Sequence, residues 1–324
     1  MNNKHKNMTK KHIRSVSLGN NIYCVDSKYI RSNFASIHFI IENNKVAIID
    51  TGTNYSSIQV LESLKNLSLE PYSVEWIILT HIHLDHAGGA GKLMKLFPNA
   101  VLGVHARGKR HMVNPEKLWN SVISVYGKSL AEKQYGKLEP VDENRIQCIG
   151  EGSEINFQGR IFEIWDAPGH AKHHVFIKDS ISKAIFTGDT FGVSYREFDN
   201  EKGSFVFISS TPTQFDPQAF KNSIYRIMKD NPPFVFLTHY SKLSSVKASG
   251  NELLKQIDEY VDITESSKYQ GKQIDKKIEE KLTDLLLKKL NLHGFTNSKS
   301  KALELINTDI SLNASGLANW ISQN

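Results

Sequence analysis

The stretch LTHIHLDHAGG, residues 79–89, places three histidines and one aspartate within six positions, directly after the apolar run WIIL. Side chains two residues apart in an extended segment point to the same side. His81 and His83 therefore project together from the end of a predicted strand, and Asp85 and His86 follow in the turn. Imidazole and carboxylate groups are ligands that zinc prefers in proteins. The stretch predicts a metal site at the carboxyl end of a buried strand.

Four other apolar runs also end in a histidine or an aspartate. They are VAIIDTG with Asp50, EIWDAPGH with His170, AIFTGDT with Asp189 and FVFLTH with His239. Taken singly, a histidine after a strand is usually a structural polar residue, and an aspartate in such a place is usually a turn former. Open α/β folds, however, build their sites at the carboxyl ends of strands. Five such endings in one chain therefore indicate one common site.

Short β-type runs alternate with helical patterns over most of the chain. Strands are predicted at 36–42, 45–50, 76–80, 100–106, 160–166, 183–188 and 234–238, and helices at 57–67, 90–97 and from Asp216 onward. In the first helix, Ile58, Leu61 and Leu64 have the spacing of an apolar face. Asp216 is a good N-cap with proline at the first helical position. This order of elements predicts an α/β layered fold.

The chain changes character after residue 245, where only amphipathic helical patterns follow. Leu253, Leu254, Ile257 and Val261 form one stripe, and 274–290 carries another. We predict a disordered basic tail at 1–14, a catalytic domain at 15–245 and a helical C-terminal extension at 246–324. The apolar stripes should dock on the catalytic domain or on a second subunit of a homodimer.

The charge, the apolar runs and the cysteine content indicate which kind of partner and which cellular compartment to expect. The 324 residues carry a net charge of +6, but residues 1–14 hold five bases and no acid, so removing them leaves 35 bases against 34 acids. We therefore do not expect a nucleic-acid partner. No apolar run approaches the ~20 residues of a membrane span, and the start does not resemble a secretory signal. With only two cysteines, we predict a protein of the reducing cytoplasm.

The pattern His81-x-His83-x-Asp85-His86, with the later His170, Asp189 and His239, resembles the metallo-β-lactamase fold superfamily over about residues 15–245. The resemblance implies a four-layer αββα sandwich that binds two divalent ions, with zinc expected and iron or manganese as alternatives. It implies that His81, His83 and His170 hold the first ion and that Asp85, His86 and His239 hold the second. Asp189 would bridge the ions, and Asp50 would support the site from behind.

The resemblance further implies a hydrolase in which two ions activate a bridging hydroxide, and Asp85 would also accept a hydrogen bond from that nucleophile. β-Lactamases of the superfamily usually have cysteine, or no carboxylate, where Asp189 stands, and flavodiiron relatives have an acid in place of His83. We expect an ester or thioester hydrolase. A phosphodiesterase or nuclease, a lactonase and a sulfur dioxygenase remain alternatives, as does a non-enzymatic metal protein, which the complete ligand set disfavours.

Other candidates are less specific. His174, or the adjacent His173, is expected to orient the site from behind, because metal-bound histidines need partners. In the predicted loop 105–119, Arg107, Lys109, Arg110 and His111 are candidates to bind an anionic part of a small substrate, such as a coenzyme A or glutathione tail; a solvated charged loop is the alternative. Tyr195 is a candidate donor to a developing oxyanion, with simple packing as its alternative.

Overall fold

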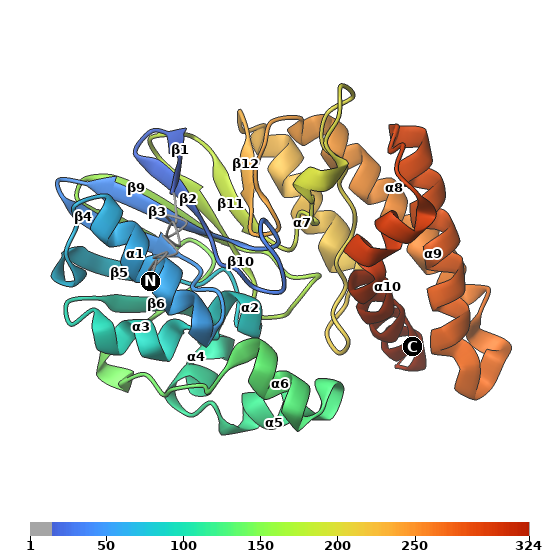
Figure 1. Cartoon of the computed structure of the whole chain (residues 1–324), viewed down its shortest axis with the longest axis horizontal. Helices are drawn as coiled ribbons and strands as arrows, with labels where there is room; N and C mark the ends of the chain where they lie inside the picture. Colours follow the sequence, from blue (N-terminus) through green and yellow to red (C-terminus); the bar gives the residue numbers. More distant parts are fainter. Residues whose placement is uncertain (1–14, 324) are drawn as a thin grey trace, which may run out of the picture.

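The computed structural model describes residues 15–323, apart from the side chains at 269, 270 and 272, so the predicted tail at 1–14 lies outside the described residues. Two mixed sheets face each other (Figure 1). In sheet order, the first contains β1 (Val16–Gly19), β2 (Ile22–Asp26), β3 (Ser36–Glu42), β4 (Lys45–Ile49), β5 (Val74–Ile78), β6 (Val101–His105) and β7 (Ile146–Ile149). The second contains β13 (Ser241–Leu243), β12 (Val235–Leu237), β11 (Ile185–Gly188), β10 (Val175–Asp179), β9 (Arg160–Asp166) and β8 (Glu154–Phe157).

Helices cover both outer faces of the sheet pair. They are α1 (Ser57–Asn66), α2 (Leu84–Ala87), α3 (Ala90–Leu96), α4 (Ala106–Val113), α5 (Glu116–Tyr126), α6 (Lys128–Tyr135), α7 (Pro217–Asp230), α8 (Val246–Glu265), α9 (Ile274–His293) and α10 (Lys299–Ser322). Helices α1 and α3 pack on the first sheet, and α7 packs on the second. The predicted four-layer αββα sandwich with a helical C-terminal region is confirmed.

The alternation of side chains along β3 shows how the layers form. Ile37 and Phe39 pack with Val60 of α1 and Leu93 of α3 on the helix side. Ile40 points to the opposite face, into the apolar layer between the two sheets. Both faces of the strand are apolar because both are covered, as expected for a sheet inside a layered fold.

The C-terminal helices share one apolar core with α7 and the second sheet (Figure 1). The stripe predicted in α9 is buried at Ile278, Leu282, Leu286 and Leu290. Each such side chain stabilises the docked helix by about 1.5–3 kcal/mol. The extension therefore packs against the sandwich of its own chain.

A glycine brings α10 against the loop that follows Phe207. A β-carbon at Gly316 would stand 2.2 Å from the carbonyl oxygen of Thr211. One turn earlier, Asn313 donates to the carbonyl oxygen of Ile208 at 2.9 Å and accepts from the N–H of Ser210 at 2.6 Å. This contact ties the extension to the loop at 208–211.

Two local expectations were wrong. The segment 105–119 is not a loop, because α4 and the first part of α5 occupy most of it. On α1, Ile58 is 54% exposed, whereas Val60 is buried. The buried stripe of α1 is therefore rotated toward Val60 and Leu64 and includes the small polar Ser63.

Candidate metal centre

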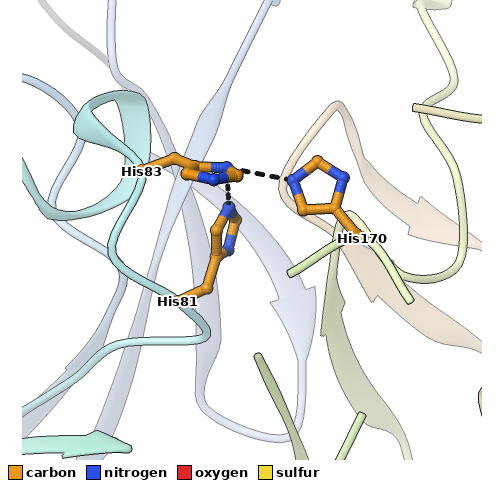
Figure 2. Close-up of side chains that lie close together, drawn as sticks. All are labelled: His81, His83 and His170. Carbon is orange, nitrogen blue, oxygen red and sulfur yellow. Dashed lines mark hydrogen bonds between the residues drawn. The ribbon is translucent and has the colours of Figure 1, made fainter. Parts of the chain in front are cut away.

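The predicted strand endings meet at one edge of the sandwich. Figure 2 shows His81, His83 and His170 turned toward one another. Nδ1 of His83 lies 2.9 Å from Nε2 of His81 and 3.0 Å from Nε2 of His170. Three ring nitrogens that converge in this way form a ready-made set of imidazole ligands for one ion.

A second group lies beside the first. One ligand-type atom from each of Asp85, His86 and His239 falls within 4.8 Å of the others. Oδ2 of Asp85 is 3.3 Å from Nε2 of His239 and 3.7 Å from Nε2 of His86. The group provides a hard carboxylate oxygen and two imidazole nitrogens.

Asp189 lies between the two groups and turns one oxygen toward each. Its Oδ2 is 3.4 Å from Nε2 of His170. Its Oδ1 is 3.4 Å from Nε2 of His86 and 3.8 Å from Nε2 of His239. The backbone allows this position because Gly188 has a φ of +47°, and a β-carbon there would lie 2.4 Å from Nε2 of His174.

Asp50 supports the cluster from behind and is 1% exposed. Its Oδ2 lies 2.9 Å from Nδ1 of His86 and accepts from the hydroxyl of Thr238 at 2.8 Å. Its Oδ1 accepts from the N–H of Thr80 at 2.8 Å. These contacts join the loops after β4, β5 and β12 and leave Nε2 of His86 facing the cluster.

Other groups orient the remaining rings. Nδ1 of His170 lies 2.7 Å from the carbonyl oxygen of Ser209, and Nδ1 of His239 lies 2.8 Å from that of Phe34. Nε2 of His174 accepts from the N–H of Asp189 at 3.1 Å. Such partners fix the tautomer and the direction of a metal-binding ring.

The electrostatics differ between the two halves of the cluster. Burial and the neighbouring imidazoles hold the pKa of His81 and of His83 well below its usual value, so both rings are neutral. Burial also disfavours charge on His86, but Asp189, Asp85 and Asp50 outweigh it and raise the pKa of His86. Burial raises the pKa of Asp85, yet His86 and His239 lower it to about 2. This half of the cluster therefore favours positive charge beside its carboxylates.

Two buried polar atoms at the centre are left without a hydrogen-bond partner among the described residues. They are Nε2 of His86 and Oδ1 of Asp189. An unpaired buried polar atom costs about 1–3 kcal/mol, and a cation between these atoms would remove that cost. The donor set and the unpaired atoms fit a site for metal ions.

A cavity of about 410 Å³ opens onto the cluster. His83, Asp85, His170, Asp189 and His239 line it, whereas His81 and His86 lie beneath. Its volume falls in the usual range of small-molecule pockets. The cluster is thus accessible to a ligand from one side.

Of the other predicted site residues, some line the cavity and others lie outside it. His111 lines the cavity, while Arg107 and Arg110 are exposed outside it. The side chain of Arg110 donates to Nε2 of His111 at 3.2 Å. Tyr195 does not line the cavity; it is fully buried, and its hydroxyl donates to Oδ1 of Asp309 at 2.9 Å. Tyr195 therefore occupies the packing position that was its alternative.

Sequence reasoning missed the contribution of α10. Thr308, Asp309 and Leu312 line the cavity, so the C-terminal extension forms part of its wall. A signal was present, because Asp309 and Asn313 interrupt the buried stripe of α10 at helical spacing. Polar residues on an apolar helical face indicate a local role.

The fold and the cluster define an αββα sandwich with a candidate metal centre at one edge. The model of the metallo-beta-lactamase superfamily matches residues 32–240, and the chain belongs to this superfamily. It is a hydrolase of the superfamily, and the histidine–aspartate cluster indicates metal binding. Over residues 15–323, no helix is long and apolar enough to cross a bilayer.

The relatives named below are about a quarter identical to this chain over the aligned residues. The metallo-beta-lactamase fold-containing protein ST1585 of Sulfurisphaera tokodaii is 27% identical over 63% of this chain and 72% of that protein. Its crystal structure superposes with a TM-score of 0.65 over 92% of this chain and 98% of that one. A hydroxyacylglutathione hydrolase of Klebsiella pneumoniae is 27% identical over 48% of this chain and 46% of its own length. The human acyl-coenzyme A thioesterase MBLAC2 is 24% identical over 53% of this chain and 64% of its own length. The match thus spans about half of the hydroxyacylglutathione hydrolase.

Proposed function

We propose that this chain is a dinuclear metal-dependent hydrolase of thioesters or related esters. The position of Asp189 is the observation that supports it most, because one carboxylate oxygen faces each of two ligand groups. In this proposal His81, His83 and His170 hold the first ion, and Asp85, His86 and His239 hold the second. Asp189 joins them, and zinc is the proposed metal.

Held by these ligands, two divalent ions would supply a nucleophile from water at neutral pH and would polarise the carbonyl oxygen of the substrate. Asp85 lines the cavity and is 21% exposed, so its carboxylate would be placed to accept a hydrogen bond from that water. Asp50 and His174 keep His86 and Asp189 in place through the contacts described above. Residues 15–245 form the catalytic domain, and 246–324 complete its cavity.

The choice of thioester rests on two kinds of support. Relatives include a hydroxyacylglutathione hydrolase and an acyl-coenzyme A thioesterase, as their names state. Arg107, Arg110 and the cavity residue His111 lie on α4, and the side chain of Arg107 reaches the carbonyl oxygen of Lys172 at 3.4 Å. The guanidinium groups of Arg107 and Arg110 form a cationic rim outside the cavity that suits the anionic part of a coenzyme A or glutathione thioester, whereas burial and Arg110 lower the pKa of His111. The two cysteines are free, which suits the proposed cytoplasmic location.

A substrate panel with the metal-replete protein tests this proposal. Octanoyl-coenzyme A, an S-acylglutathione, p-nitrophenyl butyrate and bis-p-nitrophenyl phosphate are compared at equal concentration. We expect kcat/KM to be highest for a thioester and lost in Asp189→Ala. A phosphodiester hydrolysed faster than every acyl compound would contradict the proposal and favour the phosphodiesterase alternative.

A further inference from the structure

Apolar side chains from three segments line much of the cavity, beside polar ones such as Ser121 and Ser124. Ile30 and Phe34 come from the segment between β2 and β3, Leu118 and Val122 from α5, and Leu312 from α10. These three segments are distant in the sequence and converge on one space that is continuous with the metal cluster. A ligand at the cluster therefore has an apolar chamber beside its reacting group.

Helix α5 is unusual because none of its residues is buried. Leu118 and Val122 are only partly covered, and Val125 is 48% exposed, although all three line the cavity. Apolar side chains left partly uncovered at helical spacing are costly in water unless a ligand covers them. The exposed stripe of α5 thus points to an apolar occupant.

Charge excludes other occupants of this chamber. Among the described residues that line the cavity, none is lysine or arginine. Beyond the aspartates of the cluster, the charged side chain in the wall is Asp309, whose Oδ2 is buried without a hydrogen-bond partner. A carboxylate or phosphate at the far end of the substrate would meet this acid and no cation. An uncharged chain is not repelled by Asp309 and does not need a cation to balance it.

We infer that the chamber binds a saturated acyl chain of medium length, so that the substrate class is medium-chain acyl thioesters. This inference rests on the proposed thioesterase activity. The cavity measures about 410 Å³, within the range of small-molecule pockets, and we take it to hold a thioester with a chain of roughly six to ten carbons. The acyl chain lies along α5, and the thiol part leaves toward the cationic rim on α4.

The test uses thioesters of N-acetylcysteamine, whose leaving group is uncharged, with acyl chains from acetyl to dodecanoyl. We expect kcat/KM to rise about three- to fourfold per methylene up to roughly eight carbons and then to level off. Val122→Phe fills the chamber and should lower the octanoyl value by about tenfold or more, and the acetyl value by a clearly smaller factor. Leu130→Phe on α6 is the matched control, because Leu130 is 43% exposed and does not line the cavity.

A flat or falling chain-length profile would overturn the inference, as would equal losses for acetyl and octanoyl substrates in Val122→Phe. Binding of octan-1-ol and of ethanol to the full chain, measured by calorimetry, separates this result from failure of the proposed function. If no thioester is hydrolysed, yet octan-1-ol binds more tightly than ethanol and Val122→Phe weakens it, the apolar chamber stands and the thioesterase proposal falls. Equal binding of the two alcohols would overturn the chamber itself.

Discussion

Oδ2 of Asp50 lies 2.9 Å from Nδ1 of His86, so the ring turns its other nitrogen toward the cluster. Both side chains are buried, and the contact joins the end of β4 to the turn after β5. The carboxylate selects the tautomer with a proton on Nδ1, which leaves the lone pair on Nε2 for a cation. This contact is the basis of the first prediction.

Asp50→Asn should weaken binding of the second ion by about 10- to 100-fold, because a ring without its carboxylate partner is a weaker and less oriented ligand. Titration with zinc against a chelating indicator measures the affinity. Asp166→Asn is the matched control, since Asp166 also ends a strand but contacts His105 instead of the cluster. Equal metal affinity in the two variants would show that Asp50 does not orient His86.

Asp189→Asn should lower kcat by several orders of magnitude and reduce the bound metal toward one ion per chain. The amide keeps the size of the side chain but loses the negative charge between the two ligand groups. Circular dichroism checks that the fold is intact, and elemental analysis counts the metal. Near-normal turnover with two ions bound would rule out a bridging role.

Metal content is the third prediction. The two ligand groups and the unpaired atoms of His86 and Asp189 lead us to expect about two ions per chain in protein purified without chelators. Removal of the metal should lower the melting temperature, because an ion at 100 times its Kd stabilises the fold by about 2.7 kcal/mol. Elemental analysis and calorimetry measure both effects. A content of one ion or less after zinc reconstitution would contradict the dinuclear assignment.

Asp309 gives a pH-dependent stability. Burial raises its pKa to about 6, above the unfolded value of about 3.9, so the folded chain binds the proton more tightly. Below about pH 4 both states are protonated and the residue costs nothing. As the pH rises from about 4 to about 6 the unfolded chain loses the proton before the folded chain does, and stability falls until both states hold a carboxylate.

Asp309→Asn should therefore raise the melting temperature at pH 7.5, on the order of 2–4 °C, and change it little at pH 4. Scanning calorimetry at the two values measures the difference. Asp284→Asn, on the exposed side of α9, is the control and should shift neither. A stabilisation that is equal at both pH values would not come from this titration.

Docking of the extension is the fifth prediction. Asn313→Ala leaves the N–H of Ser210 and the carbonyl oxygen of Ile208 without their partner. We expect the free energy of unfolding to fall by about 1–3 kcal/mol. KM should rise as well, because the adjacent Ser209 orients His170. Asn307→Ala, at an exposed position of the same helix, should leave both unchanged, and similar effects in the two variants would refute the contact.

The sequence by itself determined the strands that carry the cluster, about half of the helices and the candidate ligands. Strand-end residues such as His81 and Asp189 are recognisable because their chemistry is unusual after an apolar run, and parallel strands end at one edge of a sheet. The start of helix α7 was also predicted from the sequence, and Asp216 caps it as predicted. Strand ends and helix caps can be predicted because they depend mainly on residues that are close in the sequence.

Only the tertiary structure decided what surrounds the cluster. Tyr195 lies two residues from a cavity residue, Val193, yet points into the core toward Asp309, and no local pattern distinguishes these directions. Asp309 reaches the cavity only because Gly316 and Asn313 let α10 approach the loop after Phe207. Contacts between residues a hundred positions apart depend on how the layers pack, and this packing is a property of the whole chain.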